Sequence, residues 1–304
     1  MHRAVRAALG ATFFTDWCAR PPYSAFDARF SSAVARCTGW PSPTEYDRLA
    51  REVTRSEPRS PSSSLAPSAD GEEEHARLPH FVPQDLRAVE RCGGYEQHVA
   101  RLRAVPTRAK SWHDFFNMAV WAHFPRTRWA LNELHVDQSL GPVDPRNGRA
   151  PQQNVAAQLD ESGIVVASSS LEVLAELRAL RFKRVFWERR DELLATTRFW
   201  VIGHGSLESL LAPHLGLASK GVLLELDRPP AGEHALERDP EAEAQLRVAI
   251  DRRVAALVRS WRDGAPLLDP VPLLGIPGYA DNARGDFYDD ARYFRFERRG
   301  TLNR

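Results

Sequence analysis

The period of hydrophobic and polar positions changes several times along the chain, and each change predicts a different element. Apolar residues recur every three or four positions in six segments, which is typical of amphipathic helices. These predicted helices cover residues 25–37, 42–53, 95–105, 170–180, 181–196 and 239–261. Ser170 is a serine cap for one of them, and Ser42 or Thr44 caps another that has Glu45 in its first turn.

Strand-like runs are fewer and lie in the second half of the chain. Residues 199–202 and 220–227 are short apolar runs of strand length. The stretch "VAAQLDESGIVVASS" alternates and carries turn formers from Asp160 to Gly163, which predicts a β-hairpin with Gly163 at a positive φ. Hairpins and helices without a regular βαβ alternation predict an α+β fold with a small, mostly antiparallel sheet.

The most aromatic segment, "SWHDFFNMAVWAHFPRTRWALNELH", is predicted to form two helices. A helix-period pattern runs from Trp112 to Ala122, Pro125 ends it, and a second helix starts at Arg126 or Thr127. Because the turn "HFPRT" is short, we expect the two helices to lie antiparallel as a helical hairpin.

The two ends of the chain differ from its middle. Residues 1–54 read as a small helical N-terminal lobe, and residues 55–76, rich in Ser, Pro and charge, read as a flexible linker to a main α+β domain at 77–304. The tail "DPVPLLGIPGYADNARGDFYDDARYFRF" follows neither period and predicts an extended C-terminal arm. Its aromatic residues are too apolar for water, so we expect 279–296 to pack as an ordered arm against the half of the domain that carries the polar candidates.

Composition and charge narrow the classes of function. Forty-one Lys and Arg against forty Asp and Glu leave a net charge of +1, which argues against nucleic acid or an anionic membrane as the partner. The three cysteines, Cys18, Cys37 and Cys92, form no C-x-x-C pair, so we expect a reducing compartment and neither a disulfide framework nor a zinc knuckle. The sequence contains no run of about 18 apolar residues, so it predicts no membrane-spanning helix.

Polar side chains interrupt the aromatic segment at helical spacing. His113 and Asn117 are four residues apart, and Asn132 and His135 are three apart, so each pair occupies one helix face. If the helices pack together, both pairs converge on one pocket beside Asp114, where an imidazole can act as a ligand or general base. The alternative is that these groups bond to one another and hold a buried helix pair in register.

Three further positions are candidates outside that segment. Asp160 can serve as a metal ligand or acid–base group if it projects toward His113, although turn chemistry alone explains it. In "IGHGS", His204 lies between two glycines where a strand gives way to a helix capped by Ser206, a junction open to a ligand. Arg189, in "FWERRDE", can bind an anion, although a solvated helix face paired with neighbouring acids is the favoured explanation.

Several stretches together carry a family resemblance. "SWHDFFNMAVWAHFPRTRWALNELH", "LDESGIVVAS", "FWERRDELL", "RFWVIGHGSLESLLAPHLGLASKGVLL" and "LLGIPGYADNARGDFYDDARYFR" occur in an order that resembles the bacterial family called domain of unknown function 3025. The resemblance covers roughly 110–295 and implies a cytoplasmic bacterial protein, with no activity to carry over. The positions that match its pattern are His113, Asp114, Asn117, Asn132, His135, Asp160, Glu161, His204 and Asp281.

Two functional hypotheses follow, and the sequence does not decide between them; a third, single-stranded nucleic-acid binding on Trp, Phe and Arg, is disfavoured by the balanced charge. The first is a hydrolase-type enzyme in which His113, His204 and Asp160, beside Asp114, surround a water or a divalent metal, with Asn117, Asn132, His135, Arg189 and Ser206 in binding roles. The alternative is a non-catalytic binding or assembly protein that uses an aromatic and arginine surface and has no convergent polar pocket. The first hypothesis predicts that His113 and His204 share one site.

Overall fold

A four-stranded mixed sheet forms the centre of the fold. The computed structural model describes residues 18, 20–54, 77–230 and 239–294. In the strand order β4-β3-β5-β6, β3 pairs in parallel with β5, and the two outer pairings are antiparallel. The strands are β3 (Gly163–Ser168), β4 (Thr197–Val201), β5 (Ala218–Glu225) and β6 (Asp269–Pro272). Two of the three pairings are antiparallel, so the predicted α+β class and mostly antiparallel sheet are confirmed.

The central strand β3 is hydrophobic because neighbours cover it on every side. All six of its residues are buried, and its register places Ile164 opposite Val201 on one side and Gly221 on the other. A continuous apolar run is what a strand covered on both faces requires. The second sheet is a short parallel pair, β1 (His80–Pro83) with β2 (Ala104–Thr107).

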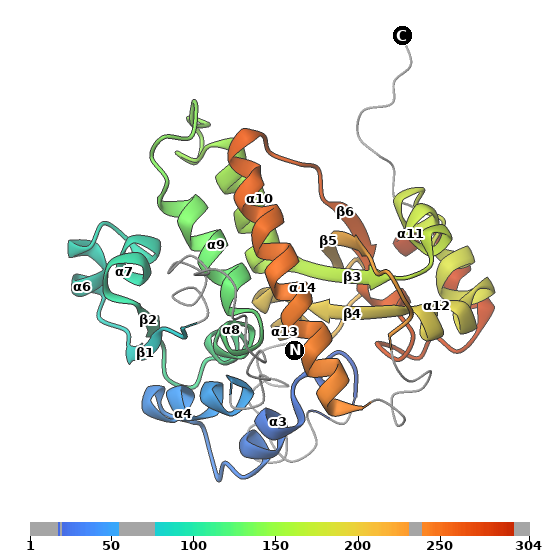
Figure 1. The fold of residues 1–304 in the computed structure, drawn as a ribbon, viewed down its shortest axis with the longest axis horizontal. Coiled ribbons are helices and arrows are strands. Elements are labelled where there is room, and N and C mark those ends of the chain that lie inside the picture. Colours follow the sequence, from blue (N-terminus) through green and yellow to red (C-terminus); the bar gives the residue numbers. More distant parts are fainter. Residues whose placement is uncertain (1–17, 19, 55–76, 231–238, 295–304) are drawn as a thin grey trace, which may run out of the picture.

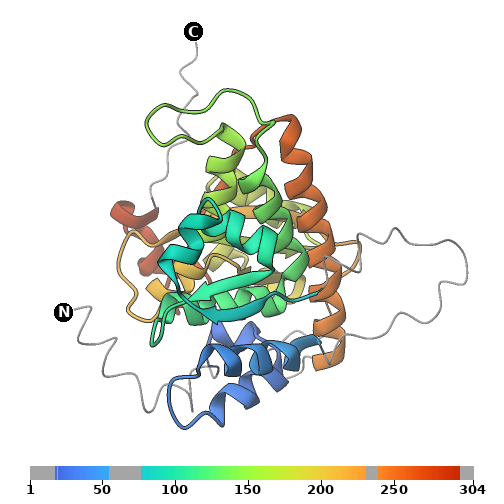
Figure 2. The same ribbon diagram turned by 90° about the vertical axis from the view of Figure 1, so that its left-hand side faces the viewer.

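Helices from the middle of the chain gather beside the sheet (Figure 1). The long helix α14 (Pro240–Ser260) packs along α9 (Pro125–Val136), as Figure 2 also shows. On its other flank α9 contacts α7 (Tyr95–Leu102) and α10 (Pro151–Ser162). The remaining described α-helices are α3 (Ala28–Ala35), α4 (Pro43–Thr54), α6 (Leu86–Arg91), α8 (Trp112–His123), α11 (Leu171–Arg178), α12 (Arg190–Thr196), α13 (His204–Ser209) and α15 (Ala291–Phe294).

Both predicted helices of the aromatic segment are confirmed, but their relative direction was predicted wrongly. Helix α8 ends at His123 and α9 begins at Pro125, so Phe124 alone connects them. Figure 1 shows α8 end-on and α9 lengthwise, and the two therefore cross steeply. Reversing the chain between helices takes a loop of about two to five residues. With a single connecting residue the chain changes direction but does not reverse, so the two helices are not antiparallel.

The predicted β-hairpin at residues 155–169 is wrong. Residues up to Ser162 belong to α10, which has Pro151 at its first position, and β3 begins at the next residue, Gly163. The apparent alternation is a helix whose buried residues Ala156 and Leu159 face the core. Gly163 has φ −80°, so the positive φ expected of a turn is absent at this residue as well.

The predicted C-terminal arm is ordered and packed as far as residue 294, and residues 295 and 296 lie outside the described chain. It opens as the edge strand β6 and continues in short helices, among them Gly285–Asp289 and α15. Tyr293 is buried, accepts a hydrogen bond from the Leu274 amide and donates one to the Leu217 carbonyl. Tyr288 stacks on Trp187. The arm therefore packs on the short π-helix Arg184–Glu188, not on the half that holds the cleft.

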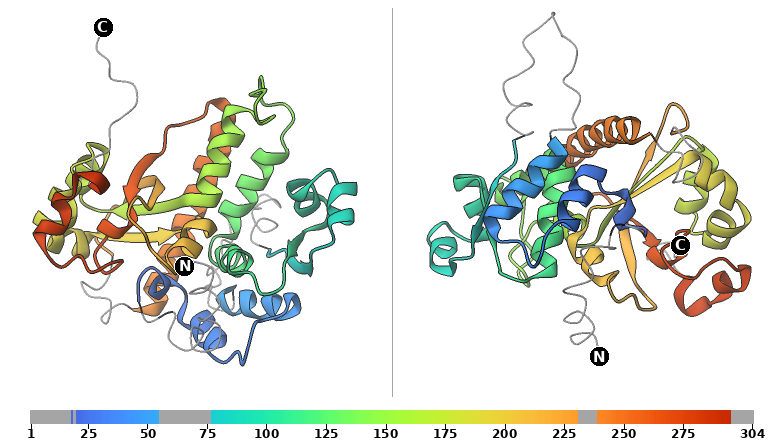
Figure 3. Two further views of the ribbon diagram at one scale, coloured as in Figure 1. Left: turned by 180° about the vertical axis from the view of Figure 1, so that it is seen from behind. Right: turned by 90° about the horizontal axis from the view of Figure 1, so that it is seen from below.

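Helix α3 packs against α4, and α4 packs against α8 (Figure 3). The predicted linker at 55–76 lies outside the described residues. Ser42 and Glu45 form the expected reciprocal cap of α4, with the Ser42 amide donating to Glu45 over 2.8 Å. Among the helices that the structure describes, none has the length and apolar character to cross a membrane.

A buried histidine joins the N-terminal helices to α8 and makes stability depend on pH. The Asp27 amide donates to His123 Nε2 over 2.8 Å, and His123 Nδ1 donates to the Ala119 carbonyl over 2.7 Å. Burial, followed by the nearby Arg247 charge, holds the pKa of His123 well below 6.5. Below pH 6.5 the unfolded chain therefore takes up a proton that the folded chain does not, and the free energy of unfolding falls as the pH falls.

We predict that His123→Gln weakens this pH dependence. Glutamine offers an acceptor and a donor at the same place but does not titrate, so the slope of unfolding free energy against pH should drop by up to about 1.4 kcal/mol per pH unit below pH 6.5. Urea unfolding of both proteins between about pH 7 and pH 5 measures the two slopes. Parallel curves would contradict the assignment.

Candidate functional site

Most of the predicted site residues line one cleft. It has a volume of about 860 Å³ and is walled by α7, α8, α9, α10 and the start of α13. Six of the nine predicted site residues line it: His113, Asp114, Asn117, His135, Asp160 and His204. The expected meeting of His113, Asp160 and His204 at a shared cavity is therefore observed.

His113 and His204 meet because α8 packs against α13. Their ring centroids are 4.3 Å apart with the rings edge to face. His204 is 7% exposed, and its burial, reinforced by the nearby Arg128 charge, lowers its pKa well below 6.5. A neutral imidazole is the form that accepts a proton or binds a metal.

Each imidazole has a carboxylate on its Nδ1 side. Glu208 Oε2 lies 3.4 Å from His113 Nδ1, and Asp160 Oδ1 lies 3.7 Å from His204 Nδ1. On the other side of the His204 ring, Glu161 Oε2 is 3.3 Å from Nε2. Asp160 and Glu161 can flank one ring because they are consecutive residues in the last turn of α10.

The cleft contains two groups of side chains that can hold a cation. In one group, ligand atoms of His113, Glu161 and His204 all lie within 4.8 Å of one another. In the other, the same holds for Glu96, His135 and Asp160. The second group already has a permanent positive charge beside it, because the Arg128 guanidinium contacts Asp160.

The glycines around His204 admit the end of α10 to the site. A Cβ on Gly205 would lie 2.1 Å from Glu161 Oε1, and a Cβ on Gly203 would lie 2.2 Å from the Gly163 amide nitrogen. From the sequence alone, these glycines indicate a junction at which a ligand can approach His204 closely. Their immediate role is different, since Gly203 lets two backbone segments touch and Gly205 leaves space for the Glu161 carboxylate next to His204.

Asp114 is held by an arginine. Both its oxygens accept hydrogen bonds from the Arg108 guanidinium, and the Arg108 amide donates to Asp114 Oδ2 over 2.5 Å. The Asp114 amide in turn donates to the hydroxyl of Ser111, the N-cap of α8. With its oxygens occupied in this way, Asp114 fixes the strand-to-helix entry that leads into His113.

Asn117 belongs to a buried chain of polar contacts. Its amide donates to the Tyr95 hydroxyl over 3.0 Å, and its carbonyl accepts from Arg128 over 2.9 Å. Arg128 then contacts Asp160. Burial raises the pKa of Tyr95 to about 12, so the hydroxyl stays protonated. The chain links four walls of the cleft, α7, α8, α9 and α10, and orients the carboxylate beside His204.

Asn132 does not line the cleft but supports a residue that does. Its amide donates to the Glu96 carboxylate over 2.6 Å and to the Glu96 carbonyl over 3.0 Å. Glu96 belongs to the second cation-capable group with His135, whose pKa is lowered by burial. The predicted helix face of Asn132 and His135 is thus real, with the carboxamide acting through Glu96.

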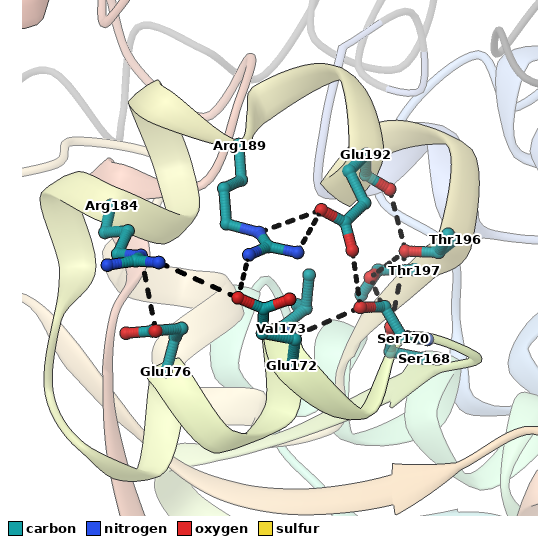
Figure 4. A network of polar contacts seen from close by, with 10 residues as sticks. All are labelled: Ser168, Ser170, Glu172, Val173, Glu176, Arg184, Arg189, Glu192, Thr196 and Thr197. Atoms are coloured by element: carbon teal, nitrogen blue, oxygen red, sulfur yellow. Dashed lines mark hydrogen bonds and ion pairs between the residues drawn. The ribbon is translucent and has the colours of Figure 1, made fainter.

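Arg189 and Ser206 are placed outside the cleft. Arg189 lies at the far end of the sheet, where it bridges Glu172 of α11 and Glu192 of α12 (Figure 4). The position of Arg189 therefore agrees with the alternative in which it pairs with acidic neighbours and binds no anion. Ser206 lies inside α13 and not at its cap, which is Gly203, and its hydroxyl shares a hydrogen bond of 3.1 Å with buried Ser219.

The arginines of the cleft were missed. Three line it, namely Arg108, Arg128 and Arg149. Arg128 could have been found, because it is four residues before Asn132 and so shares that helix face. Arg108 and Arg149 come from loop segments with no period, and the sequence carries no signal for them.

Comparisons with known proteins identify a family without naming an activity. The family described as "Protein of unknown function (DUF3025)" matches residues 79–298. No curated protein and no solved structure gives a significant match to the chain. The arrangement of the cleft is therefore the available guide to function.

Proposed function

Because the chain belongs to the family of proteins of unknown function DUF3025, we propose its activity from the cleft: a metal-dependent hydrolase whose divalent cation is held by His113, His204 and Glu161. The observation that carries this proposal is the convergence of two imidazoles and one carboxylate at an open cleft. Two histidines and a glutamate are a known ligand set of catalytic zinc, which keeps its fourth position for water or substrate.

The spacing of the ligand atoms fits a cation. Bonds of 2.0–2.1 Å in a tetrahedron put neighbouring ligand atoms about 3.4 Å apart. His204 Nε2 and Glu161 Oε2 are 3.3 Å apart, and the His113 ligand atom lies within 4.8 Å of both. A small rotation of the half-exposed His113 ring is enough to complete the set.

The carboxylates behind the two rings support the same assignment. Metal-bound histidines usually direct their other ring nitrogen at a carboxylate or carbonyl, which fixes the tautomer. Glu208 lies 3.4 Å from His113 Nδ1 and Asp160 lies 3.7 Å from His204 Nδ1, so each ring has a carboxylate near one nitrogen. Burial keeps His204 neutral to well below pH 6.5, which removes proton competition at that ligand.

The remaining groups of the cleft suit hydrolysis. A cation bound in this position lowers the pKa of a bound water toward 7 and polarises the bond to be cleaved. His135, whose pKa burial lowers, is a neutral imidazole on the opposite wall that can accept a proton. Arg128 holds Asp160 in place behind His204 and supplies fixed positive charge. We assign the cation to the first group because the Asp160 carboxylate of the second group is already paired with Arg128.

The described surface gives less support to the alternative of an aromatic docking protein. The large hydrophobic side chains that stand exposed among the described residues are all aliphatic: Leu86, Leu102, Val143, Leu171, Leu215, Leu257 and Leu267. The aromatic residues of 112–129 are instead buried in the core. A convergent polar cleft and no exposed aromatic patch on this part of the chain favour an enzyme.

We predict that the purified protein binds one Zn²⁺ and that His204→Ala and Glu161→Gln each weaken binding. Loss of a residue that hydrogen-bonds to a metal ligand typically costs about 10–100-fold in metal affinity, so loss of the ligand itself should cost on the order of 100-fold or more. His214→Ala is the matched control, because His214 is an exposed histidine outside the cleft. Calorimetric titration with Zn²⁺ measures all four proteins.

The same proteins test the reaction class. Zinc-loaded wild type should hydrolyse at least one member of a panel of chromogenic esters, phosphoesters and amides, and a chelator should stop the reaction. A wild type that binds no Zn²⁺, or affinity lost equally in the His214 variant, would refute the cation site. Hydrolysis that survives both the chelator and Glu161→Gln would refute its role.

A further inference from the structure

One arginine of the cleft has a guanidinium without a counterion. Arg108 is paired with Asp114, and Arg128 contacts Asp160. Across the described residues, Arg149 makes neither an ion pair nor a side-chain hydrogen bond, yet it lines the same cleft. An arginine presents five donors in a fixed fork that matches carboxylate and phosphate groups.

The loop that carries Arg149 has an ordered backbone. Asp144 and Arg149 form a β-bridge, in which the Asp144 amide donates to the Arg149 carbonyl over 2.8 Å. The Arg149 amide donates to Asn147 Oδ1 over 3.0 Å, and Gly148 between them has φ +66°, which glycine adopts without strain. The loop thus holds the start of the Arg149 side chain at the edge of the cleft.

Carboxamides continue from Arg149 toward the cation site. Asn154, Gln158 and Glu161 are spaced four and three residues apart on α10, so they share its cleft face. Asn147 Nδ2 donates to Asn154 Oδ1 over 3.0 Å, which leaves the Asn154 amide group to donate to a ligand. At 1.5 Å per residue, the seven residues from Asn154 to Glu161 span about 10 Å.

Almost every residue that lines the cleft carries a polar group. Pro106 and Ala157 are the aliphatic residues among those that line it, and the rest carry charges, carboxamides, hydroxyls or imidazoles. Glu96, a carboxylate of the opposite wall, is occupied by Asn132. A cavity of about 860 Å³ with this lining fits a sizeable molecule that forms many hydrogen bonds, and not a lipid.

We infer that the substrate is an elongated polar molecule with an oxyanion, a carboxylate or a phosphate, that binds Arg149 and Asn154 about 10 Å from the group to be hydrolysed. This rests on the proposed cation site for the reacting end, whereas the oxyanion site stands on its own contacts. The matched control is in the same loop. Arg146 is also exposed, but its guanidinium already donates hydrogen bonds to both carboxylate oxygens of Asp144.

The first test uses metal-free protein, so that it does not depend on the cation. Inorganic phosphate and succinate are titrated separately into wild type, Arg149→Gln and Arg146→Gln, followed by calorimetry. We expect one of the two anions to bind wild type at millimolar concentration, and the anion that binds tells phosphate from carboxylate. Arg149→Gln should weaken it about tenfold or more, since hydrogen bonds to charged groups contribute about 1.5–3 kcal/mol, and Arg146→Gln should bind as wild type. Binding by wild type of neither anion, or equal affinities in the two variants, overturns the proposal.

The second test measures the span. Suberic acid monohydroxamate carries a metal-binding hydroxamate at one end and a carboxylate at the other, and acetohydroxamate carries the metal-binding group alone. In zinc-loaded wild type the longer probe should bind more tightly, and Arg149→Gln should remove the gain without changing acetohydroxamate binding. Equal affinity of the two probes overturns the span. If acetohydroxamate does not bind while phosphate or succinate still binds through Arg149, the proposed cation site is wrong and the oxyanion site stands.

Discussion

Replacing Gly205 with alanine is expected to remove metal binding at the cleft while the protein stays folded. A Cβ at this position would lie 2.1 Å from Glu161 Oε1 and 2.7 Å from its carboxyl carbon. The end of a glutamate side chain can swing away cheaply, and Glu161 is 59% exposed, so the carboxylate should leave the His204 ring for solvent. Gly205 lies in α13, where alanine gains up to about 1 kcal/mol of helix propensity that offsets the strain.

Titration with Zn²⁺ and urea unfolding together measure this expectation. Affinity should fall on the order of 100-fold or more, like that of Glu161→Gln, with little change in the free energy of unfolding. Gly203→Ala is the contrasting variant, because its Cβ meets the Ser162 and Gly163 backbone, which cannot move aside. That variant should lose stability first. Wild-type zinc affinity in Gly205→Ala would mean that Glu161 is not a ligand.

Replacing Arg128 with methionine is expected to destabilise the protein more than any other single change at the cleft. The Arg128 side chain is 5% exposed, contacts Asp160 and donates to Asn117. Its charge also lies 5.0 Å from the centre of the Trp121 ring. Removing one partner of a buried pair leaves the other charge uncompensated, which costs about 3–5 kcal/mol.

A double-mutant cycle separates the pair from the packing of Arg128. Asp160→Asn in the Arg128→Met background removes the stranded charge, so the double variant should recover part of the lost stability. Arg146→Met is the control, since Arg146 is an exposed arginine paired with Asp144 and should unfold like wild type. A loss below about 1 kcal/mol in Arg128→Met, the size of a surface pair, would contradict a structural role for the Arg128–Asp160 contact.

The local elements of the fold could be predicted because their causes are local. The helix-period patterns at 25–37, 42–53 and 239–261 correspond to α3, α4 and α14, and the capping residues Ser42 and Ser170 act as predicted. Helical periodicity reflects contacts between residues three and four positions apart. Residues this close along the chain can be compared in the sequence without knowing the fold. The prediction of a hairpin at Asp160 failed because turn formers at the end of a helix look like those between strands.

The chemical types of the candidate site were also visible in the sequence. His113 and His204 were expected to share a site, and their ring centroids lie 4.3 Å apart. Both are histidines in places where an apolar residue would pack more simply, one within an aromatic helix and one between glycines. That signal survives without knowing the fold, because a buried imidazole needs partners at both nitrogens.

The sequence by itself thus determined most of the helices, the α+β class and which polar residues are unusual, since these depend on neighbours a few positions away. Only the tertiary structure decided which of those residues meet. It brought Glu161 and Asp160 to His204 from the end of a helix, added Arg128 and Arg149, and placed Arg189 and Ser206 elsewhere. The reason is that convergence depends on how α8, α10 and α13 pack on one another, and contacts between residues about 40 to 90 positions apart leave no period in the chain.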